Sequence, residues 1–335
     1  MSARYDFASD NTAPATPQAI EALVAANSGF AAAYGADDVT GQAADAIRDF
    51  LDADAEVRFV ASGTAANSIA LAAICRPFEA VLAHAHAHVR TDESGAPGLF
   101  GHGLGLIPLA GASGRIDPGA LVQALAAPEV AHNQPPAALS LTQATEYGTV
   151  YTAAELAALV APAQAQGCAV HLDGARLANA VAAGFDPKAI ARLGVDIAVI
   201  GGTKAGMTPA EALVIFDRAL VRRFDARLKQ AGQLPSKGRF HAAPFLGMLP
   251  AAMVAHAAHA NAMARRLAAL MPFPVLHPVE ANGVFVEMDE AALERLHARG
   301  WFVHRFLDGS VRFMCSWAVT PEAVDKLGED LRAIR

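Results

Sequence analysis

Apolar runs typical of buried strands alternate along the chain with longer stretches of helical pattern. The runs lie near 57–61, 80–84, 104–108, 137–142, 168–173, 195–201 and 211–216. Helices are expected between them, near 64–75, 117–126, 152–166 and 187–193. Strands that alternate with helices in this way need crossover connections. The pattern therefore predicts an α/β fold with a mainly parallel seven-stranded sheet flanked by helices.

The pattern changes on either side of this alternating region. Thr16 and Pro17 have the residue types of a helix N-cap and a first helical position, so a helix is expected to begin there. A long helical stretch is expected over 239–270, ending at the prolines of Met271-Pro-Phe-Pro. The remainder of the chain, from about residue 275, is expected to form strand, strand, helix, strand, strand and helix, in that order. The chain is expected to divide into an N-terminal arm over 1–16, a large domain over 17–270 and a small C-terminal α+β domain over 271–335.

Composition narrows the class of protein. Of the 335 residues, 53% are hydrophobic and 18% are charged, which allows a sizeable core. The net charge is −7 without a long basic run, so nucleic acid is not an expected partner. The chain has no strictly apolar stretch of membrane-spanning length, and its first residues lack the apolar run of a secretory signal. Three widely spaced cysteines favour a reduced, cytoplasmic location.

Two short motifs place a carboxylate and a lysine at the ends of two predicted strands. His171-Leu-Asp173-Gly-Ala-Arg176 follows one apolar run, and Gly201-Gly-Thr-Lys204 follows the next. Open parallel sheets carry their chemistry at this edge. Enzymes that use pyridoxal phosphate need such a pair, because the lysine amine forms a Schiff base with the aldehyde and an acid faces the pyridine nitrogen. We predict these roles for Lys204 and Asp173, with Arg176 beside the ring oxygen or beside Asp173.

A third motif has the residues of a phosphate-binding loop. Ser62-Gly-Thr-Ala-Ala-Asn67 follows the first apolar run and opens a helix. Small residues leave backbone N–H groups free at a helix N-terminus, where the helix dipole favours an anion. An ordinary N-cap would have the same residue types. Because the lysine and the aspartate are already assigned, we predict that Gly63 and Thr64 bind the phosphate of the coenzyme.

The run His84-Ala-His86-Ala-His88 has two interpretations. Alternate histidines on one face of an extended segment could bind zinc or copper, which would make the chain a metal-binding protein. No cysteine lies nearby to complete such a site, so we expect no metal and predict that His88 stacks on the coenzyme ring. A further histidine, His132, precedes the apolar run at 137–142. It is expected at the mouth of the same sheet, with an ordinary loop position as the alternative.

Arg312 stands out in the small domain, because it lies within the apolar run Val311-Arg-Phe-Met-Cys. An arginine among apolar residues usually needs an anionic partner. A substrate carboxylate would satisfy that need, and so would an internal salt bridge.

Seven motifs, in this order, resemble those of the pyridoxal phosphate-dependent L-threonine aldolases. They are Phe7-Ala-Ser-Asp-Asn, Tyr34-Gly-Ala-Asp-Asp, Ser62-Gly-Thr-Ala-Ala-Asn, His86-Ala-His, His171-Leu-Asp-Gly-Ala-Arg, Gly201-Gly-Thr-Lys and Arg312-Phe-Met-Cys-Ser-Trp. The resemblance covers nearly the whole chain and implies the fold of the aspartate aminotransferases, fold type I. It also implies pyridoxal 5'-phosphate as the cofactor. A homo-oligomer, either a dimer or a tetramer, is implied as well, with active sites at a subunit boundary.

The resemblance further implies roles for individual residues. Toward the coenzyme it implies Lys204 as the Schiff-base lysine, Asp173 as the partner of the ring nitrogen and Arg176 as the neighbour of the ring oxygen. It also implies that Gly63 and Thr64 form the phosphate loop and that His88 stacks on the ring. Toward the substrate it implies that His132 lies near the hydroxyl and that Ser9 and Arg312 hold the carboxylate. Tyr34 is implied to lie near the entrance of the site. Lys237 resembles a basic residue that reaches a phosphate.

The chain departs from a common bacterial branch of that family at three places. Ala205 follows the lysine where many relatives have asparagine, and Gln143 stands where the branch has an asparagine near the ring. The segment Leu234-Pro-Ser-Lys-Gly-Arg-Phe replaces a glycine-rich stretch. This segment resembles a subgroup that includes enzymes active on aromatic hydroxy amino acids such as phenylserine.

Together these features predict a carbon–carbon lyase. It would cleave L-threonine, L-allo-threonine or a related β-hydroxy-α-amino acid to glycine and an aldehyde. His88 or His132 would take the proton of the β-hydroxyl. The alternative is another fold type I enzyme, a β-eliminating lyase or an aminotransferase, although no second arginine is evident for a dicarboxylic substrate.

Overall fold

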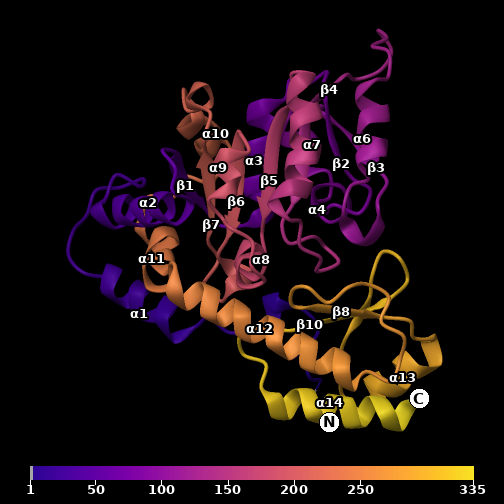
Figure 1. The fold of residues 1–335 in the computed structure, drawn as a ribbon. Coiled ribbons are helices and arrows are strands. Elements are labelled where there is room, and N and C mark those ends of the chain that lie inside the picture. The colour runs from indigo at the N-terminus through magenta and orange to yellow at the C-terminus, as the bar shows by residue number, and fades with distance from the viewer. Residues whose placement is uncertain (1–2) are drawn as a thin grey trace.

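The computed structural model describes residues 3–335 as a large α/β unit joined to a smaller α+β unit (Figure 1). The strands of the large sheet are β1 (Glu56–Val60), β2 (Ala80–His84), β3 (Gly105–Leu109), β4 (Pro136–Thr142), β5 (Ala169–Gly174), β6 (Ile197–Gly201) and β7 (Glu211–Ile215). Their order is β1-β7-β6-β5-β4-β2-β3, and only β7 runs antiparallel to its neighbours. The predicted fold class is confirmed, and the predicted strands agree with the observed ones to within two residues at each end.

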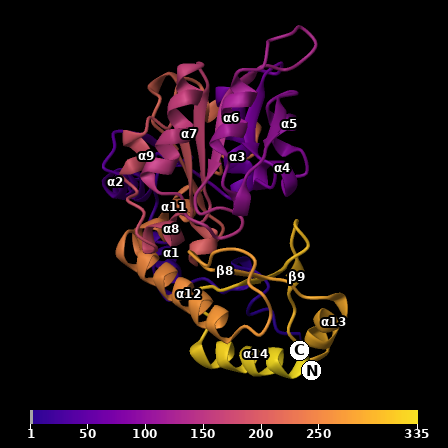
Figure 2. The same ribbon diagram turned by 45° about the vertical axis from the view of Figure 1, so that its right-hand side comes forward.

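Helices cover both faces of this sheet (Figure 2). Those of the large unit are α1 (Pro17–Ala26), α2 (Asp38–Leu51), α3 (Gly63–Ile74), α4 (His88–Thr91), α5 (Ala96–Phe100), α6 (Pro118–Leu125), α7 (Ala153–Ala165), α8 (Leu177–Ala182), α9 (Ala189–Arg192), α10 (Phe224–Gln230) and α11 (Arg239–Met248). Successive residues of β6 face opposite layers, because strand side chains alternate. Ile197 and Val199 pack with α3 and α10, whereas Ala198 and Ile200 pack in the core that contains α7.

The long helical stretch predicted over 239–270 is two helices. After α11 the chain turns, and α12 (Ala251–Leu270) continues at an angle of 71°. Pro250 lies at the break, where it has no N–H to donate to a continuous helix. The first half of α12 packs in the core of the large unit, and its second half packs in the core of the small unit. Within residues 3–335, no single helix has the length and apolar composition of a membrane span, although α11 and α12 taken together meet both criteria.

The small unit contains β8 (Gly283–Val286), α13 (Glu290–Ala298), β9 (His304–Arg305), β10 (Val311–Met314) and α14 (Pro321–Ile334). Its strands form an antiparallel sheet in the order β8-β10-β9. The strand expected first, from about residue 275, is reduced to a single bridge between Val275 and Val286. The prolines at 272, 274 and 278 explain this difference, since proline cannot donate to a strand ladder.

The N-terminal arm packs against the small unit. Arg4 forms a bridge with Trp301, and the Phe7 carbonyl accepts the N–H of Met314 at 2.9 Å. The Phe7 side chain is buried in the core of the small unit. A 3-10 turn over Asp10–Thr12 follows and carries the arm to the carboxyl edge of the large sheet. The arm therefore brings polar side chains to the junction of the two units.

Candidate active site

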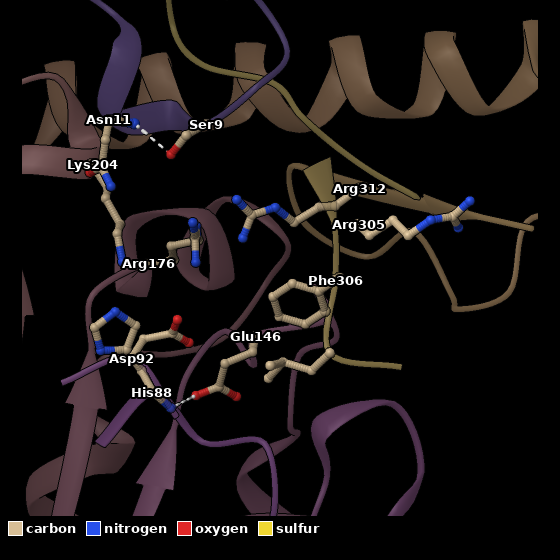
Figure 3. Close-up of a pocket in the computed structure, with 11 residues that line it drawn as sticks. Ser9, Asn11, His88, Asp92, Glu146, Arg176, Lys204, Arg305, Phe306 and Arg312 are labelled. Atoms are coloured by element: carbon tan, nitrogen blue, oxygen red, sulfur yellow. Dashed lines mark hydrogen bonds between the residues drawn. The ribbon is translucent and has the colours of Figure 1, made fainter. Parts of the chain in front are cut away.

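A cavity of about 390 Å³ lies between the carboxyl edge of the large sheet and the β9–β10 hairpin (Figure 3). Its walls come from three parts of the chain, which are the arm (Ser9, Asn11), the large unit (His88, Asp92, Glu146, Arg176, Lys204) and the small unit (Arg305, Phe306, Leu307, Arg312). The structure thus brings five of the predicted site residues together, namely Ser9, His88, Arg176, Lys204 and Arg312.

Lys204 lines this cavity, and Asp173 comes to the same edge of the sheet from the adjacent parallel strand. Asp173 lies near the end of β5, opposite Val199 of β6, and Lys204 follows β6 in a short 3-10 turn. The carboxyl ends of parallel strands share one edge, so both groups face the same part of the sheet. Burial and the charge of Arg176 lower the pKa of Lys204. A lowered pKa favours the neutral amine, the form that attacks an aldehyde.

The Asp173 carboxylate is held in place on both oxygens. Oδ1 accepts the Ala175 N–H at 2.9 Å, and Oδ2 accepts the side-chain amide of Asn67, also at 2.9 Å. Burial acts to raise the pKa of Asp173, but the neighbouring His88 and Lys204 outweigh it and hold the pKa below its usual range. Asp173 is therefore a fixed, ionised carboxylate suited to hold a proton on a ring nitrogen.

Two residues without a predicted role connect Asp173 to His88. The Asn67 amide also donates to Glu93 Oε1 at 2.8 Å, and the same oxygen lies 2.9 Å from Nδ1 of His88. Burial opposes a charged imidazole, but the hydrogen bond that His88 donates to Glu93 and the charge of Asp173 raise the pKa of His88. Asn67 ends the Ser62–Asn67 motif, so its position was visible in the sequence. Glu93 lacked a comparable signal.

Arg176 pairs with Asp10 rather than with Asp173. Its Nε and Nη2 donate to the two carboxylate oxygens at 2.6 and 2.9 Å, and both side chains are buried. Burial would raise the pKa of Asp10, but Arg176 lowers it to about 2. The alternative in which Arg176 contacts Asp173 itself is therefore wrong. The role at the ring oxygen stays a prediction.

The predicted phosphate loop lies at the same edge of the sheet. Because β1 and β6 are both antiparallel to β7, they run parallel to each other and end on the same side. Gly63 and Thr64 form the first turn of α3, and the preceding Ser62 caps it by accepting the Ala65 N–H at 3.3 Å. One turn later on the same helix, Asn67 contacts Asp173. This position suits the N-terminus of α3 for phosphate binding, which stays a prediction.

His132 does not reach this site in its own chain. It is exposed in the loop before β4, at the amino end of that strand. The carboxyl end of β4 faces the cavity, so His132 lies at the opposite edge of the sheet. The prediction that it lies at the mouth of the site in its own chain is wrong, and its role at the substrate hydroxyl stays a prediction.

Tyr34 and Lys237 lie together, but away from the cavity lining. The Tyr34 N–H donates to the Ser236 carbonyl at 3.1 Å, and the Tyr34 ring is 51% exposed. Lys237 is exposed in the same segment. Nearby, Gln233 accepts the Ala61 N–H at 2.9 Å, just before the predicted phosphate loop. Neither residue is brought to Lys204, and both roles stay predictions.

The three histidines of the 84–88 run have separate partners. His84 ends β2 and its Nε2 lies 3.1 Å from the Gly111 carbonyl, while Nδ1 of His86 lies 2.5 Å from the Tyr147 hydroxyl. Only His88, at the start of α4, lines the cavity. The run is therefore not one extended segment, and residues 3–335 contain no cluster of His, Cys, Asp and Glu arranged to hold a metal.

The polar groups of the Gln143 side chain have partners within its own loop. Its amide accepts the Tyr151 N–H at 3.0 Å and donates to the Tyr151 carbonyl at 2.8 Å, and the side chain is fully buried. Both polar ends of Gln143 are thus used to fasten the loop after β4. Asn67, from α3, is the amide that contacts Asp173 instead.

His171 makes a pH-dependent contribution to stability. It is fully buried beside Asp173 on β5, and burial lowers its pKa from 6.5 to about 4. Between these pH values the unfolded chain binds a proton that the folded protein does not, so stability falls as the pH falls through this window. We expect a loss of about 3 kcal/mol from this residue. Urea unfolding at both ends of the window should show a smaller pH dependence in His171→Gln, and equal pH dependence would contradict the assignment.

This set of side chains fits pyridoxal phosphate. The site has an amine with a lowered pKa, a fixed carboxylate, an imidazole and the N-terminus of a twelve-residue helix on one edge of the sheet. These groups match the aldehyde, the ring nitrogen, the ring face and the phosphate of that coenzyme. In addition, Arg312 Nε is buried without a hydrogen-bond partner in residues 3–335, as expected if an anion completes the site.

Comparisons with known proteins agree with this geometry. A model of the beta-eliminating lyase family matches residues 6–291. The chain is 44% identical to a low specificity L-threonine aldolase of Pseudomonas aeruginosa, over 98% of this chain and 97% of that protein. The structure of Leishmania major threonine aldolase superposes with a TM-score of 0.90 at 30% identity, covering 99% of this chain and 100% of that one.

A more distant structure shows the fold alone. Serine palmitoyltransferase of S. paucimobilis, solved with a pyridoxal phosphate–myriocin adduct, has a TM-score of 0.67 at 16% identity and covers 99% of this chain and 86% of that one. Fold type I is therefore confirmed. On the family match and on the identity to its curated relative, the chain belongs to the beta-eliminating lyase family, among the relatives of the L-threonine aldolases.

Proposed function

We propose that this enzyme uses pyridoxal phosphate to cleave β-hydroxy-α-amino acids into glycine and an aldehyde. L-threonine, L-allo-threonine and phenylserine are the candidate substrates. The observation that carries the proposal is that Lys204 and Arg312 line one cavity, with Asp173 on the strand beside Lys204, in a chain 44% identical to an L-threonine aldolase.

Each part of the site has a task in this reaction. When bound, pyridoxal phosphate supplies an aldehyde for the substrate amine and a ring that accepts the electron pair of the broken Cα–Cβ bond. Asp173 keeps a proton on the ring nitrogen, and Lys204 holds the aldehyde until a substrate arrives. Ser9 and Arg312 bind the substrate carboxylate, which fixes rotation about the N–Cα bond and aligns the bond to be broken. Phe306 lines the cavity from the small unit, where its apolar ring would limit the access of water to a bound substrate (Figure 3).

A panel of amino acids tests this function. The protein is incubated with L-threonine, L-allo-threonine or phenylserine, with and without added coenzyme, and aldehyde, glycine, keto acid and ammonia are assayed. We expect aldehyde and glycine in equal amounts. Keto acid and ammonia without glycine would instead support a β-eliminating lyase, and keto acid formed only with an amino acceptor would support an aminotransferase.

Arg312 should determine how tightly the substrate binds. Within residues 3–335 it has no carboxylate partner, and its one hydrogen bond, to the Ala8 carbonyl, is 3.4 Å long. Burial and the nearby Arg176 lower the pKa of Arg312, so an anion would be a favourable partner. We expect Arg312→Gln to raise KM about 10- to 100-fold, with a smaller effect on kcat.

Arg305→Gln is the matched control for this prediction. Arg305 lines the same cavity, but two hydrogen bonds of 2.8 and 2.9 Å already pair it with Glu290. Its replacement should therefore change KM much less. If the two variants raised KM equally, Arg312 would not be the specific partner of the carboxylate.

We also propose a cytoplasmic homo-oligomer, either a dimer or a tetramer. Ile20, Val24 and Phe30 of α1 and the following loop are exposed apolar side chains, which favours a protein interface there. Tyr34 and Lys237 would serve the site of a neighbouring subunit, since they do not line the cavity of their own. The three cysteines are buried and unpaired, in keeping with a reducing compartment. Sedimentation equilibrium would distinguish a monomer, a dimer and a tetramer.

A further inference from the structure

Glu146 is a buried acid in the cavity that the reaction described above leaves without a task. It lies in the loop after β4, is 8% exposed, and lines the cavity beside His88 (Figure 3). Its Oε1 accepts the backbone N–H of His88 at 2.9 Å and the Thr142 hydroxyl at 3.0 Å. Its Oε2 is buried and has no hydrogen-bond partner in residues 3–335. Because an unpaired buried oxygen is costly, a ligand in the cavity is its expected partner.

Lys204 and Arg312 would orient a bound amino acid so that the groups on its β-carbon face Glu146. The substrate amine is directed to the position of Lys204, and the carboxylate to Arg312. In Figure 3, His88, Asp92 and Glu146 lie across the cavity from Arg312. The groups on the β-carbon are therefore left to face the acidic side of the cavity, where a hydroxyl can donate to a carboxylate.

The other candidate bases fit this position less well. His132 lies at the opposite edge of the sheet. His88 has its Nδ1 bonded to Glu93, and its raised pKa lowers the share of the neutral imidazole, the form that can accept a proton. Asp92 lines the cavity too, but it is exposed and accepts the Thr91 hydroxyl at 2.8 Å. Of the two acids that line the cavity, Glu146 is the one that combines burial with an oxygen that has no partner in residues 3–335.

We propose that Oε2 of Glu146 is the base that takes the proton from the β-hydroxyl of the substrate. This inference rests on the proposed function. In the step the hydroxyl O–H bond breaks and its proton passes to Oε2. The freed electron pair forms the aldehyde C=O, while the Cα–Cβ bond breaks and its electron pair enters the ring of the coenzyme. After the aldehyde leaves, Glu146 releases this proton to water, and Cα takes up one proton as the electron pair returns to it, which gives glycine.

The surroundings of Glu146 suit it to this task. Burial, with a contribution from the charge of Asp173, raises its pKa, although the hydrogen bond from the His88 N–H opposes that shift. A carboxylate with a raised pKa is a stronger base near neutral pH. The charged and titratable groups that influence it or share the cavity with it are His88, Asp92, Tyr147, Tyr151, Asp173, Arg176, Lys204, Arg305 and Arg312. Since the base must be ionised, kcat/KM should rise with pH through the pKa of Glu146.

The test uses two reactions of the Glu146→Gln holoenzyme. Aldehyde release from a β-hydroxy amino acid needs the base, whereas exchange of the α-proton of glycine with deuterium does not. We expect Glu146→Gln to lower aldehyde release at least about 100-fold. Its glycine exchange, followed by NMR, and its visible coenzyme absorption should stay within a few-fold of those of the wild type. Asp92→Asn, the neighbouring acid, should lose less aldehyde release than Glu146→Gln.

Thr142→Val provides a second measurement that keeps the carboxylate in place. Removing the Thr142 hydroxyl withdraws a hydrogen bond from the charged form of Glu146, which raises its pKa. The acidic limb of the kcat/KM profile should therefore move to higher pH. An unmoved limb would overturn the proposal. The proposal would also fail if Glu146→Gln released aldehyde nearly as fast as the wild type, or if it lost aldehyde release and glycine exchange in the same proportion. A larger loss of aldehyde release in Asp92→Asn than in Glu146→Gln would contradict it too. If the wild type exchanged glycine but released no aldehyde from any substrate, the proposed function itself would fail, and this inference with it.

Discussion

Lys204→Ala should abolish covalent attachment of pyridoxal phosphate and lower aldehyde release at least about 1,000-fold. Lys204 follows β6 at the edge where Asp173 lies near the end of β5, and it lines the cavity. Burial lowers the pKa of its amine, which favours the neutral nucleophile. Without that amine the coenzyme aldehyde has no group to which it can attach. Reduction with borohydride followed by mass spectrometry would detect the trapped adduct in the wild type and its absence in the variant.

Lys188→Ala is the control for this measurement. Lys188 is exposed, and its amine makes one long contact of 3.4 Å with the exposed Asp52 carboxylate. Its loss should therefore change neither the adduct nor the activity. The visible absorption of the coenzyme should show the same contrast, with the protein-bound band present in Lys188→Ala and absent in Lys204→Ala. An adduct of wild-type yield in Lys204→Ala would assign the coenzyme to a different lysine.

The large sheet could be predicted because each strand carries its own local signal. All residues of β2, β6 and β7 are buried, so these strands read as continuous apolar runs. Helix α2 was missed although its capping residue, Asp37, accepts the Thr40 N–H at 2.8 Å. Gly41 lowers its helix propensity, although its buried residues Ala43, Ala44, Ile47 and Leu51 do recur at a helical spacing. The break between α11 and α12 was missed because apolar and alanine-rich sequence continues on both sides of Pro250.

Site residues could be predicted where a strand end and a motif coincide, as at Asp173 and Lys204. The Asp10–Arg176 pair joins positions 166 residues apart, and no local pattern indicates which acid an arginine will meet. Glu93 and Glu146 were missed for the same reason, since their partners come from other elements. The error at His132 was avoidable. A residue just before a parallel strand lies at its amino end, whereas the chemistry is at the carboxyl end.

Asp173→Asn should have the second largest effect, a loss of about 100- to 10,000-fold in kcat. The substitution keeps the size of the side chain but removes the negative charge. An amide cannot hold a proton on the ring nitrogen, so the ring becomes a poorer acceptor of the electron pair from the Cα–Cβ bond. The Asp173 carboxylate is ionised in the folded protein, because His88 and Lys204 overcome the effect of burial. Steady-state aldehyde release measures the loss.

A coenzyme analogue with a methylated ring nitrogen separates charge from geometry in this experiment. Its ring is permanently positive, so it should restore part of the activity of Asp173→Asn while leaving the wild type no faster. Asn67→Ser serves as the comparison, because it removes the amide that donates to Asp173 Oδ2 but leaves the carboxylate in place. Asn67→Ser should lose less activity than Asp173→Asn, and the analogue should not restore that activity. If the analogue failed to improve Asp173→Asn, a positive ring nitrogen would not replace the carboxylate, and Asp173 would act by positioning the ring.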